Sequence, residues 1–225
     1  MIFDPMYLLF MLPGLLLSIW AQFKVKSSFK KYSKVNSERR LTGREAARMI
    51  LDQNGMRDVE VEKIAGNLTD HYDPRQNVIR LSDPVYDSAS IAAVGIAAHE
   101  AGHAVQHKTG YAFIKLRMSI IPICNLGSSL APWLIILGLW MQILELYWAG
   151  IIAFSLVALF QLVTLPVEFN ASKRAVLILE SNGTLSANEL HGTKKVLSAA
   201  ALTYVAALLT SLLQILYFVL RARRR

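Results

Sequence analysis

The sequence contains a single cysteine, Cys124, which lies in an apolar stretch. A disulfide framework is therefore excluded, and a structural zinc site, which usually draws on several cysteines, is disfavoured. No pattern typical of a nucleic-acid-binding module is present, so we expect no nucleic-acid partner. Nothing in the sequence specifies an oligomeric state. The lack of disulfides is compatible with an active domain that faces the cytosol.

Apolar residues, by contrast, are abundant. They make up 54% of the 225 residues, and the mean hydropathy is +0.37. The formal charge of +8 falls largely near the ends of hydrophobic segments, a distribution that suits an anionic lipid surface. We therefore expect an α-helical integral membrane protein that contacts the lipid bilayer.

The hydrophobic stretches predict three to four transmembrane helices. Residues 1–23 are read as an uncleaved anchor, because no basic residue precedes the apolar run and no cleavage site follows it. Residues 118–166 are read as a hairpin of two crossings joined by an aromatic turn. Basic residues after the anchor predict an outside N-terminus and a cytoplasmic segment 24–117. The last run, within 196–225, is long enough to cross but ends in RARRR. A fourth crossing would place this tail outside, and the sequence leaves that open.

The polar region carries an alanine-rich segment, IAAVGIAAHEAGHAVQHKT, at residues 91–109. Ser88 and Ser90 are candidate N-caps and Gly110 is a natural stop, so the segment predicts a helix. A capping box at Thr42 predicts an earlier helix. Two short strands are predicted between these helices, at 58–64 and 77–82, with a turn-rich connection at 68–75. Together they form a small α+β unit.

The alanine-rich segment contains His99, Glu100 and His103 in the order H-E-x-x-H. On a helix, residues four apart share a face, so the two imidazoles can bind one ion. Glu100 can then take a proton from a water on that ion. The motif predicts a zincin-like catalytic unit that binds Zn²⁺, with Glu100 as general base.

A catalytic zinc usually takes a third protein ligand. His107 is disfavoured, because on a continuous helix it lies ~12 Å beyond His99 along the axis. The remaining candidates are His71, His191 and the carboxylates of residues 167–195. Glu168 is favoured among them, because a two-crossing hairpin would return it to the membrane surface near the metal helix.

Several segments carry a resemblance to a known family. HEAGH, LPVEFNASKRA at 165–175 and AALTYVAALL at 200–209 resemble the YugP-type membrane zinc metallopeptidases of bacteria. More distantly the chain is similar to the HtpX-like gluzincins, whose third zinc ligand is the Glu of an E-x-x-x-D motif. That resemblance implies Glu168 as the ligand. The aspartate position holds Ser172, so Ser172 or Asn170 is the candidate partner of a zinc histidine.

The resemblance implies a zinc-dependent endopeptidase of the bacterial cell membrane. Because the metal helix and Glu168 both lie near transmembrane ends, we expect peptide or membrane-protein substrates, in quality control or processing. The expected layout is an anchor (1–23), a catalytic unit (24–117), a hairpin (118–166), a second catalytic segment (167–195) and a C-terminal helix with a basic tail (196–225). Tyr204 and His191 are candidate oxyanion donors. The HtpX-like enzymes suggest that the strand 77–81 is an edge for an extended substrate. The alternatives are a catalytically silent zinc-binding scaffold and, less favoured, a metal transporter.

Overall fold

The computed structural model describes residues 5–224, and the chain divides into two compact units. The helical unit comprises Met1–Gln22, Lys115–Pro166 and Leu202–Arg225. The mixed unit comprises Phe23–Ile114 and Val167–Ala201. Each unit therefore combines segments that are far apart in the sequence, and several long helices have residues in both.

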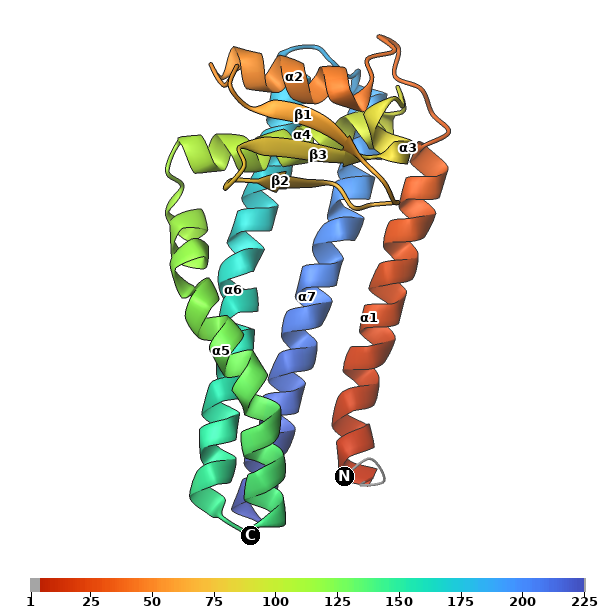
Figure 1. Cartoon of the computed structure of the whole chain (residues 1–225). Coiled ribbons are helices and arrows are strands. Elements are labelled where there is room, and N and C mark those ends of the chain that lie inside the picture. The colour runs from red at the N-terminus through yellow and green to blue at the C-terminus, as the bar shows by residue number, and fades with distance from the viewer. Residues whose placement is uncertain (1–4, 225) are drawn as a thin grey trace. The chain divides into compact units, whose positions relative to one another are not determined.

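Within residues 5–224, four long helices are apolar enough to cross a membrane by length and composition (Figure 1). They are α1 (Pro5–Tyr32), α5 (Ala112–Trp140), α6 (Leu144–Ser181) and α7 (Ala187–Arg223). The expected number of three to four crossings agrees with this count, and α7 supplies the fourth candidate. The predicted hairpin ends at residue 166, but the helix α6 continues through Pro166 into the second catalytic segment. α7 begins well before the predicted C-terminal run at 196. An intramembrane proline is tolerated where neighbouring groups compensate for the lost hydrogen bond.

Glycines allow the helices of the helical unit to approach closely. A Cβ on Gly14 of α1 would lie 2.8 Å from the hydroxyl oxygen of Thr210 on α7, and one on Gly150 of α6 would lie 2.8 Å from the backbone nitrogen of Ile135 on α5. Small residues at such contacts are typical of helix pairs in lipid, where close van der Waals packing drives association. Aromatic rings add further contacts, among them Tyr7 against Tyr217, 5.1 Å apart.

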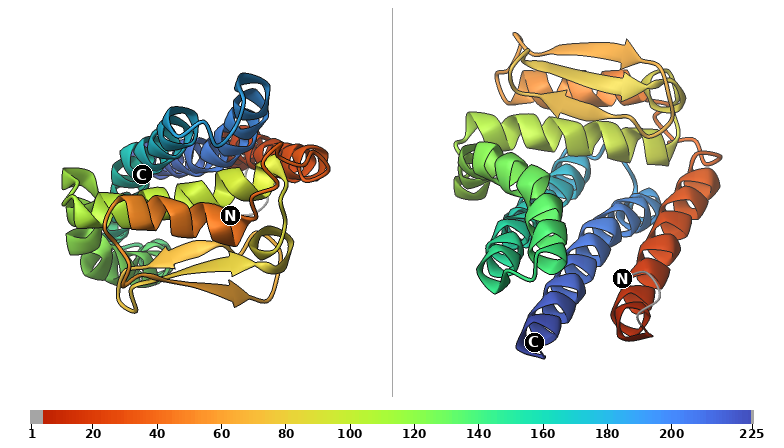
Figure 2. Two further views of the ribbon diagram at one scale, coloured as in Figure 1. Left: turned by 90° about the horizontal axis from the view of Figure 1, so that it is seen from above. Right: turned by 60° about the horizontal axis from the view of Figure 1, so that its bottom comes forward.

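The mixed unit begins its core with α2 (Gly43–Gln53), which carries the predicted capping box. The Thr42 hydroxyl accepts a hydrogen bond from the Glu45 N–H, and a Glu45 carboxylate oxygen accepts one from the Thr42 N–H. Both donors would otherwise be unsatisfied at the helix start. α2 packs against α4 (Ile91–Lys108), and the sheet lies beside these two helices (Figure 2).

In the described part of the chain, the sheet has three strands, in the order β1-β3-β2. β1 (Glu60–Ile64) pairs in parallel with β3 (Val78–Ser82), and β2 (His71–Asp73) pairs antiparallel with β3. The sequence prediction of only a turn at 68–75 was wrong, because β2 is three residues long and too short to show an alternating pattern. The strand at 77–81 is also not an edge. Its apolar residues Val78, Ile79 and Leu81 are all buried, as expected of a central strand.

The short α3 (Asp83–Tyr86) connects the sheet to α4. Ser90 is the N-cap of α4, and its hydroxyl accepts a hydrogen bond from the Ala93 N–H at 3.2 Å. Gly110 follows the helix with a φ of 63°, the left-handed conformation that ends helices. The predicted start, end and cap of this helix are therefore confirmed.

Candidate metal centre

Two glycines of α4 allow other helices of the mixed unit to reach it. A Cβ on Gly102 would lie 2.9 Å from the carbonyl oxygen of Ala171 on α6. A Cβ on Gly95 would lie 2.5 Å from a side-chain carbon of Thr193 on α7. Gly102 is the glycine inside the H-E-A-G-H sequence, so the backbone of α6 contacts α4 within the motif itself.

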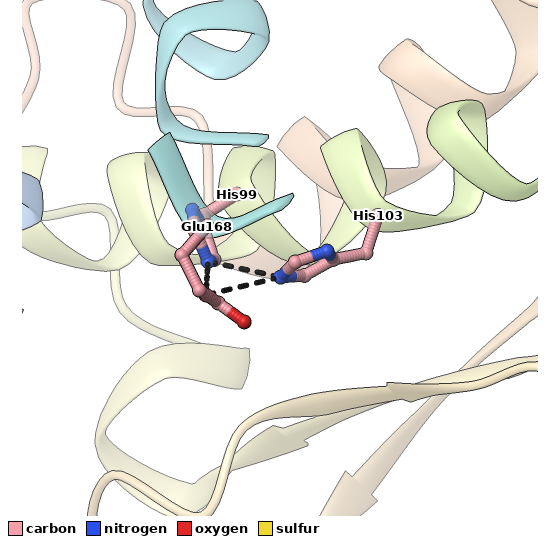
Figure 3. A group of neighbouring side chains, drawn as sticks. All are labelled: His99, His103 and Glu168. Carbon is pink, nitrogen blue, oxygen red and sulfur yellow. Dashed lines mark hydrogen bonds and ion pairs between the residues drawn. The ribbon is translucent and has the colours of Figure 1, made fainter. Parts of the chain in front are cut away.

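The close contact brings Glu168 of α6 to His99 and His103 of α4 (Figure 3). The Nε2 atoms of the two histidines are 3.1 Å apart. A Glu168 carboxylate oxygen, Oε2, lies 3.3 Å from His99 Nε2 and 3.5 Å from His103 Nε2. Within residues 5–224, these three residues form the group whose donor atoms could hold one metal ion.

These distances fit a zinc ion. Zinc binds imidazole nitrogen and carboxylate oxygen at about 2.0–2.2 Å in tetrahedral geometry, which places neighbouring ligand atoms ~3.3 Å apart. The three observed separations, 3.1, 3.3 and 3.5 Å, bracket that value. Lone pairs that face each other at such distances repel unless a proton or a cation lies between them, so the arrangement favours a bound cation.

Burial and charge point the same way. Glu168 is 4% exposed, and the side chains of His99 and His103 are 15% and 12% exposed. Burial lowers the pKa of His103, but its hydrogen bond to Glu168 and the negative charges of Glu100 and Glu168 outweigh this effect and raise the pKa above its ordinary value. The site therefore attracts positive charge, which a metal ion can supply.

Glu100 is not one of the three, although it lies between His99 and His103 in the sequence. It is 8% exposed, and its Oε2 accepts a hydrogen bond from the backbone N–H of Tyr72 at 3.0 Å. Tyr72 is the middle residue of the edge strand β2. The carboxylate is thus held by the sheet rather than by the helix that carries it.

The outer nitrogen of each histidine also has a partner. His99 Nδ1 lies 3.1 Å from the Ser172 hydroxyl, as the E-x-x-x-D comparison suggested for this position. His103 Nδ1 lies 3.0 Å from the side-chain oxygen of Gln106. Sequence reasoning missed Gln106, although its spacing three residues after His103 places both on one helix face.

The other histidines are not members of the group. His71 belongs to β2, where its Nδ1 lies 2.8 Å from the Thr69 carbonyl oxygen. His107 is exposed near the end of α4, with its ring 6.2 Å from that of Tyr72. His191 is exposed on the second turn of α7. Tyr204 lies on the part of α7 that belongs to the helical unit. The roles predicted for His191 and Tyr204 stay predictions.

Known proteins resemble this chain over most of its length. The profile of the family described as "Putative neutral zinc metallopeptidase" matches residues 7–223. The chain is 55% identical over 204 residues to a Bacillus subtilis (strain 168) protein described as "Putative membrane protease YugP", and the match covers 91% of each chain. No solved structure matches the chain.

Proposed function

The chain belongs to this family of zinc metallopeptidases, and from that premise we propose that it is a membrane-embedded endopeptidase of the gluzincin type. His99, His103 and Glu168 hold the zinc, and Glu100 is the general base. The observation that carries this proposal is the convergence of the three donor atoms within 4.8 Å, next to a buried fourth side chain that is not one of them.

The proposed reaction is hydrolysis of a peptide bond. When bound, the zinc supplies Lewis acidity, which polarises the peptide carbonyl and makes water easier to deprotonate. Glu100 accepts the proton of the attacking water and returns it to the leaving amine. The hydrogen bond from the Tyr72 N–H fixes the direction of the Glu100 carboxylate. Tyr204 and His191 are proposed as donors to the oxyanion of the tetrahedral intermediate, and each needs its own test.

We propose β2 rather than β3 as the strand beside which an extended peptide lies. β2 is an edge of the sheet, and its central residue, Tyr72, contacts Glu100 through its backbone. Edge strands offer unpaired N–H and C=O groups along which a peptide can add. Recognition through the backbone would give little preference for the sequence of the substrate.

We propose that the site lies at the cytoplasmic surface of the membrane. Membrane proteins are the natural substrates at this surface, and their cleavage would serve quality control or processing. Along α6, Glu168 follows the apolar stretch that ends at Pro166. Residues 24–44 carry eight lysines and arginines, against four in residues 221–225. The larger basic cluster sets the orientation, so 24–114 is cytoplasmic and the C-terminal tail lies outside after a fourth crossing.

Cysteine labelling tests this orientation. In a Cys124→Ser background, Met141→Cys and Arg224→Cys should react with a membrane-impermeant maleimide on intact cells, whereas Glu180→Cys should react only after permeabilisation. Met141 is exposed in the turn between α5 and α6, and Glu180 is exposed near the end of α6. The reverse labelling pattern would place the metal centre outside the cell.

The activity is tested by zinc content and by cleavage of casein or a membrane protein, measured on detergent-purified protein. Wild type should contain one zinc per chain and cleave the substrate. Glu100→Gln should keep its zinc but lose about 10²–10⁴-fold in cleavage rate, the usual contribution of a general base. Glu180→Gln, an exposed glutamate on α6, is the control. If Glu100→Gln retains zinc and full activity, the base assignment is wrong. If wild type binds zinc and cleaves nothing, a silent scaffold is favoured.

A further inference from the structure

Gln106 is fully buried and makes hydrogen bonds at both ends of its side chain. Its oxygen lies 3.0 Å from His103 Nδ1. Its nitrogen donates to the Val167 carbonyl oxygen at 2.8 Å and to the Asn170 side-chain oxygen at 2.9 Å. Nothing in the proposed reaction uses this residue, and a buried amide is costly to the fold unless all its groups are satisfied.

The partners of Gln106 settle which end of the amide faces which neighbour. The Val167 carbonyl can only accept a hydrogen bond, so it must face the Gln106 nitrogen. The amide oxygen then faces His103, and because that oxygen can only accept, His103 Nδ1 must carry the proton. In the neutral imidazole, His103 Nε2 then carries a lone pair that faces His99 and Glu168.

We propose that Gln106 is a positioning residue for the metal centre, which fixes His103 as the Nδ1–H tautomer and at the same time ties it to the backbone beside Glu168. This inference rests on the proposed zinc site and deepens it. Val167 immediately precedes Glu168, so a single side chain links the second histidine to the segment that carries the third ligand.

Asn170 and Arg174 extend the same chain of hydrogen bonds. The Asn170 oxygen accepts from Gln106 and also from Arg174 Nε, at 2.9 and 2.8 Å. Both neighbours are donors, so the orientation of the Asn170 amide is determined as well. The Arg174 guanidinium, four residues after Asn170 on α6, thereby fixes the orientation of the Asn170 amide. The Asn170 oxygen in turn holds the nitrogen of Gln106 on the side away from His103.

The two zinc histidines differ in how tightly their tautomers are set. His99 Nδ1 faces the Ser172 hydroxyl, which can either donate or accept. His103 faces an amide oxygen that can only accept. Removal of a group that hydrogen-bonds to a metal-binding histidine typically weakens metal affinity by about 10–100-fold. Gln106 should therefore contribute more to zinc binding than its distance from the reacting atoms suggests.

The test is the zinc dissociation constant of the full-length, detergent-purified protein, measured by competition with a chromogenic chelator. Gln106→Met keeps the length of the side chain but removes both polar ends. Gln106→Glu keeps an acceptor for His103. Thr193→Val is the matched control, because Thr193 is also fully buried and its hydroxyl donates to the carbonyl oxygen of Ile91 on the same helix α4.

Gln106→Met should bind zinc about 10–100-fold more weakly than wild type. Gln106→Glu keeps the acceptor for His103 but loses the donor to Val167 and Asn170, so it should recover only part of that loss. Thr193→Val should bind zinc as wild type does, even where its melting temperature falls as far as that of Gln106→Met. Wild-type affinity in Gln106→Met, or equal weakening in Thr193→Val, would each overturn the positioning role.

Asn170→Ala provides a second variant in case Gln106→Met does not fold. It removes one acceptor of Gln106 and leaves Val167 in place, so a several-fold weaker zinc affinity is expected, and an unchanged affinity would contradict the proposal. Failure of the zinc site itself gives a different result. In that case wild type binds no stoichiometric zinc, or His103→Ala binds it as wild type does, whatever Gln106 contributes.

Discussion

The helical unit and the mixed unit bury different kinds of polar group. Among the described residues of the helical unit, the polar atoms of buried side chains are hydroxyl groups and one thiol, on Tyr147, Thr164, Ser211, Tyr217 and Cys124. Thr164 donates to the carbonyl oxygen of Phe160 in its own helix, and Tyr147 donates to the carbonyl oxygen of Phe218 on α7. The mixed unit buries carboxylates and an amide, including Glu100, Gln106 and Glu168, which bond to other elements.

This difference separates packing within the membrane from construction of the metal centre, although the same long helices take part in both. α6 carries residues of both units, with Thr164 before Pro166 and Glu168 after it. In a bilayer, a hydroxyl group can be satisfied by a backbone carbonyl oxygen, which matters because no water is present to replace a lost partner. In the mixed unit, carboxylates and an amide join α4, α6 and β2. We therefore expect substitutions in the helical unit to change stability, and substitutions in the mixed unit to change zinc binding as well.

The largest effect is expected from loss of the third ligand. Glu168→Ala should weaken zinc binding by more than about 100-fold, because removing a ligand costs more than removing a second partner, and cleavage should disappear with the zinc. Glu180→Ala on the same helix should bind zinc normally, since Glu180 is exposed. Zinc content after dialysis against a chelator provides the measurement, and a zinc-replete Glu168→Ala would remove Glu168 from the ligand set.

Close packing at Gly102 should rank next. In Gly102→Ala the new methyl group meets the Ala171 carbonyl oxygen at 2.9 Å, so α6 must shift relative to α4 and carry Glu168 with it. We expect about 1–3 kcal/mol of destabilisation together with weaker zinc binding.

Gly150→Ala is the comparison from the helical unit, where the methyl group meets the Ile135 backbone nitrogen at 2.8 Å. It should lower the melting temperature without changing the zinc dissociation constant. Equal loss of zinc affinity in both variants would show that the two units are not separable in this way.

The effect of zinc on stability should depend on pH. The pKa of His103 in the zinc-free protein is raised, so its protonation stabilises the fold below its ordinary pKa of 6.5, and this contribution is lost as pH rises through the higher folded value. Zinc needs the neutral imidazole, so the stabilisation that zinc adds should increase over the same range.

Melting temperatures with and without zinc, at pH 6 and at pH 8, measure this effect. The increase caused by zinc should be greater at pH 8. His107→Asn, which changes an exposed histidine on the same helix, should retain the dependence. An increase that is constant or shrinks with pH would contradict the assignment of His103 as a ligand.

The smallest effects should come from single hydroxyl groups. Ser90→Ala removes the N-cap of α4 and should lower the free energy of unfolding by about 1 kcal/mol. Ser155→Ala removes a hydroxyl that donates to the Ile151 carbonyl oxygen of its own helix, so a change within about 0.5 kcal/mol is expected. Denaturant titration of both variants measures the two free energies of unfolding, and a larger loss in Ser155→Ala than in Ser90→Ala would contradict the expectation.

The parts of the fold that could be predicted from the sequence were those with local signals. The capping box at Thr42, the cap at Ser90 and the stop at Gly110 are set by neighbouring residues, so their helices were found. β2 was missed because three residues cannot establish a strand period, and its pairing with β3 comes from the tertiary fold. The apolar pattern placed the end of the hairpin at 166, but it could not show that α6 continues as a helix into the polar segment beyond Pro166.

The candidate site shows the same limit. His99 and His103 follow from a four-residue spacing, whereas Glu168, more than sixty residues away, needed an argument about two membrane crossings and a resemblance to known enzymes. Gln106 has a local spacing to His103, but its partners Val167 and Asn170 lie on another helix. Only the contact between α4 and α6 makes its importance visible.

X-ray absorption at the zinc edge, on wild-type protein loaded with one zinc per chain, tests the central claim most directly. We predict two imidazole nitrogens and a carboxylate oxygen at about 2.0–2.2 Å, with no sulfur ligand. A sulfur shell at about 2.3 Å, or three or more imidazoles, would show that the zinc is bound by residues other than His99, His103 and Glu168.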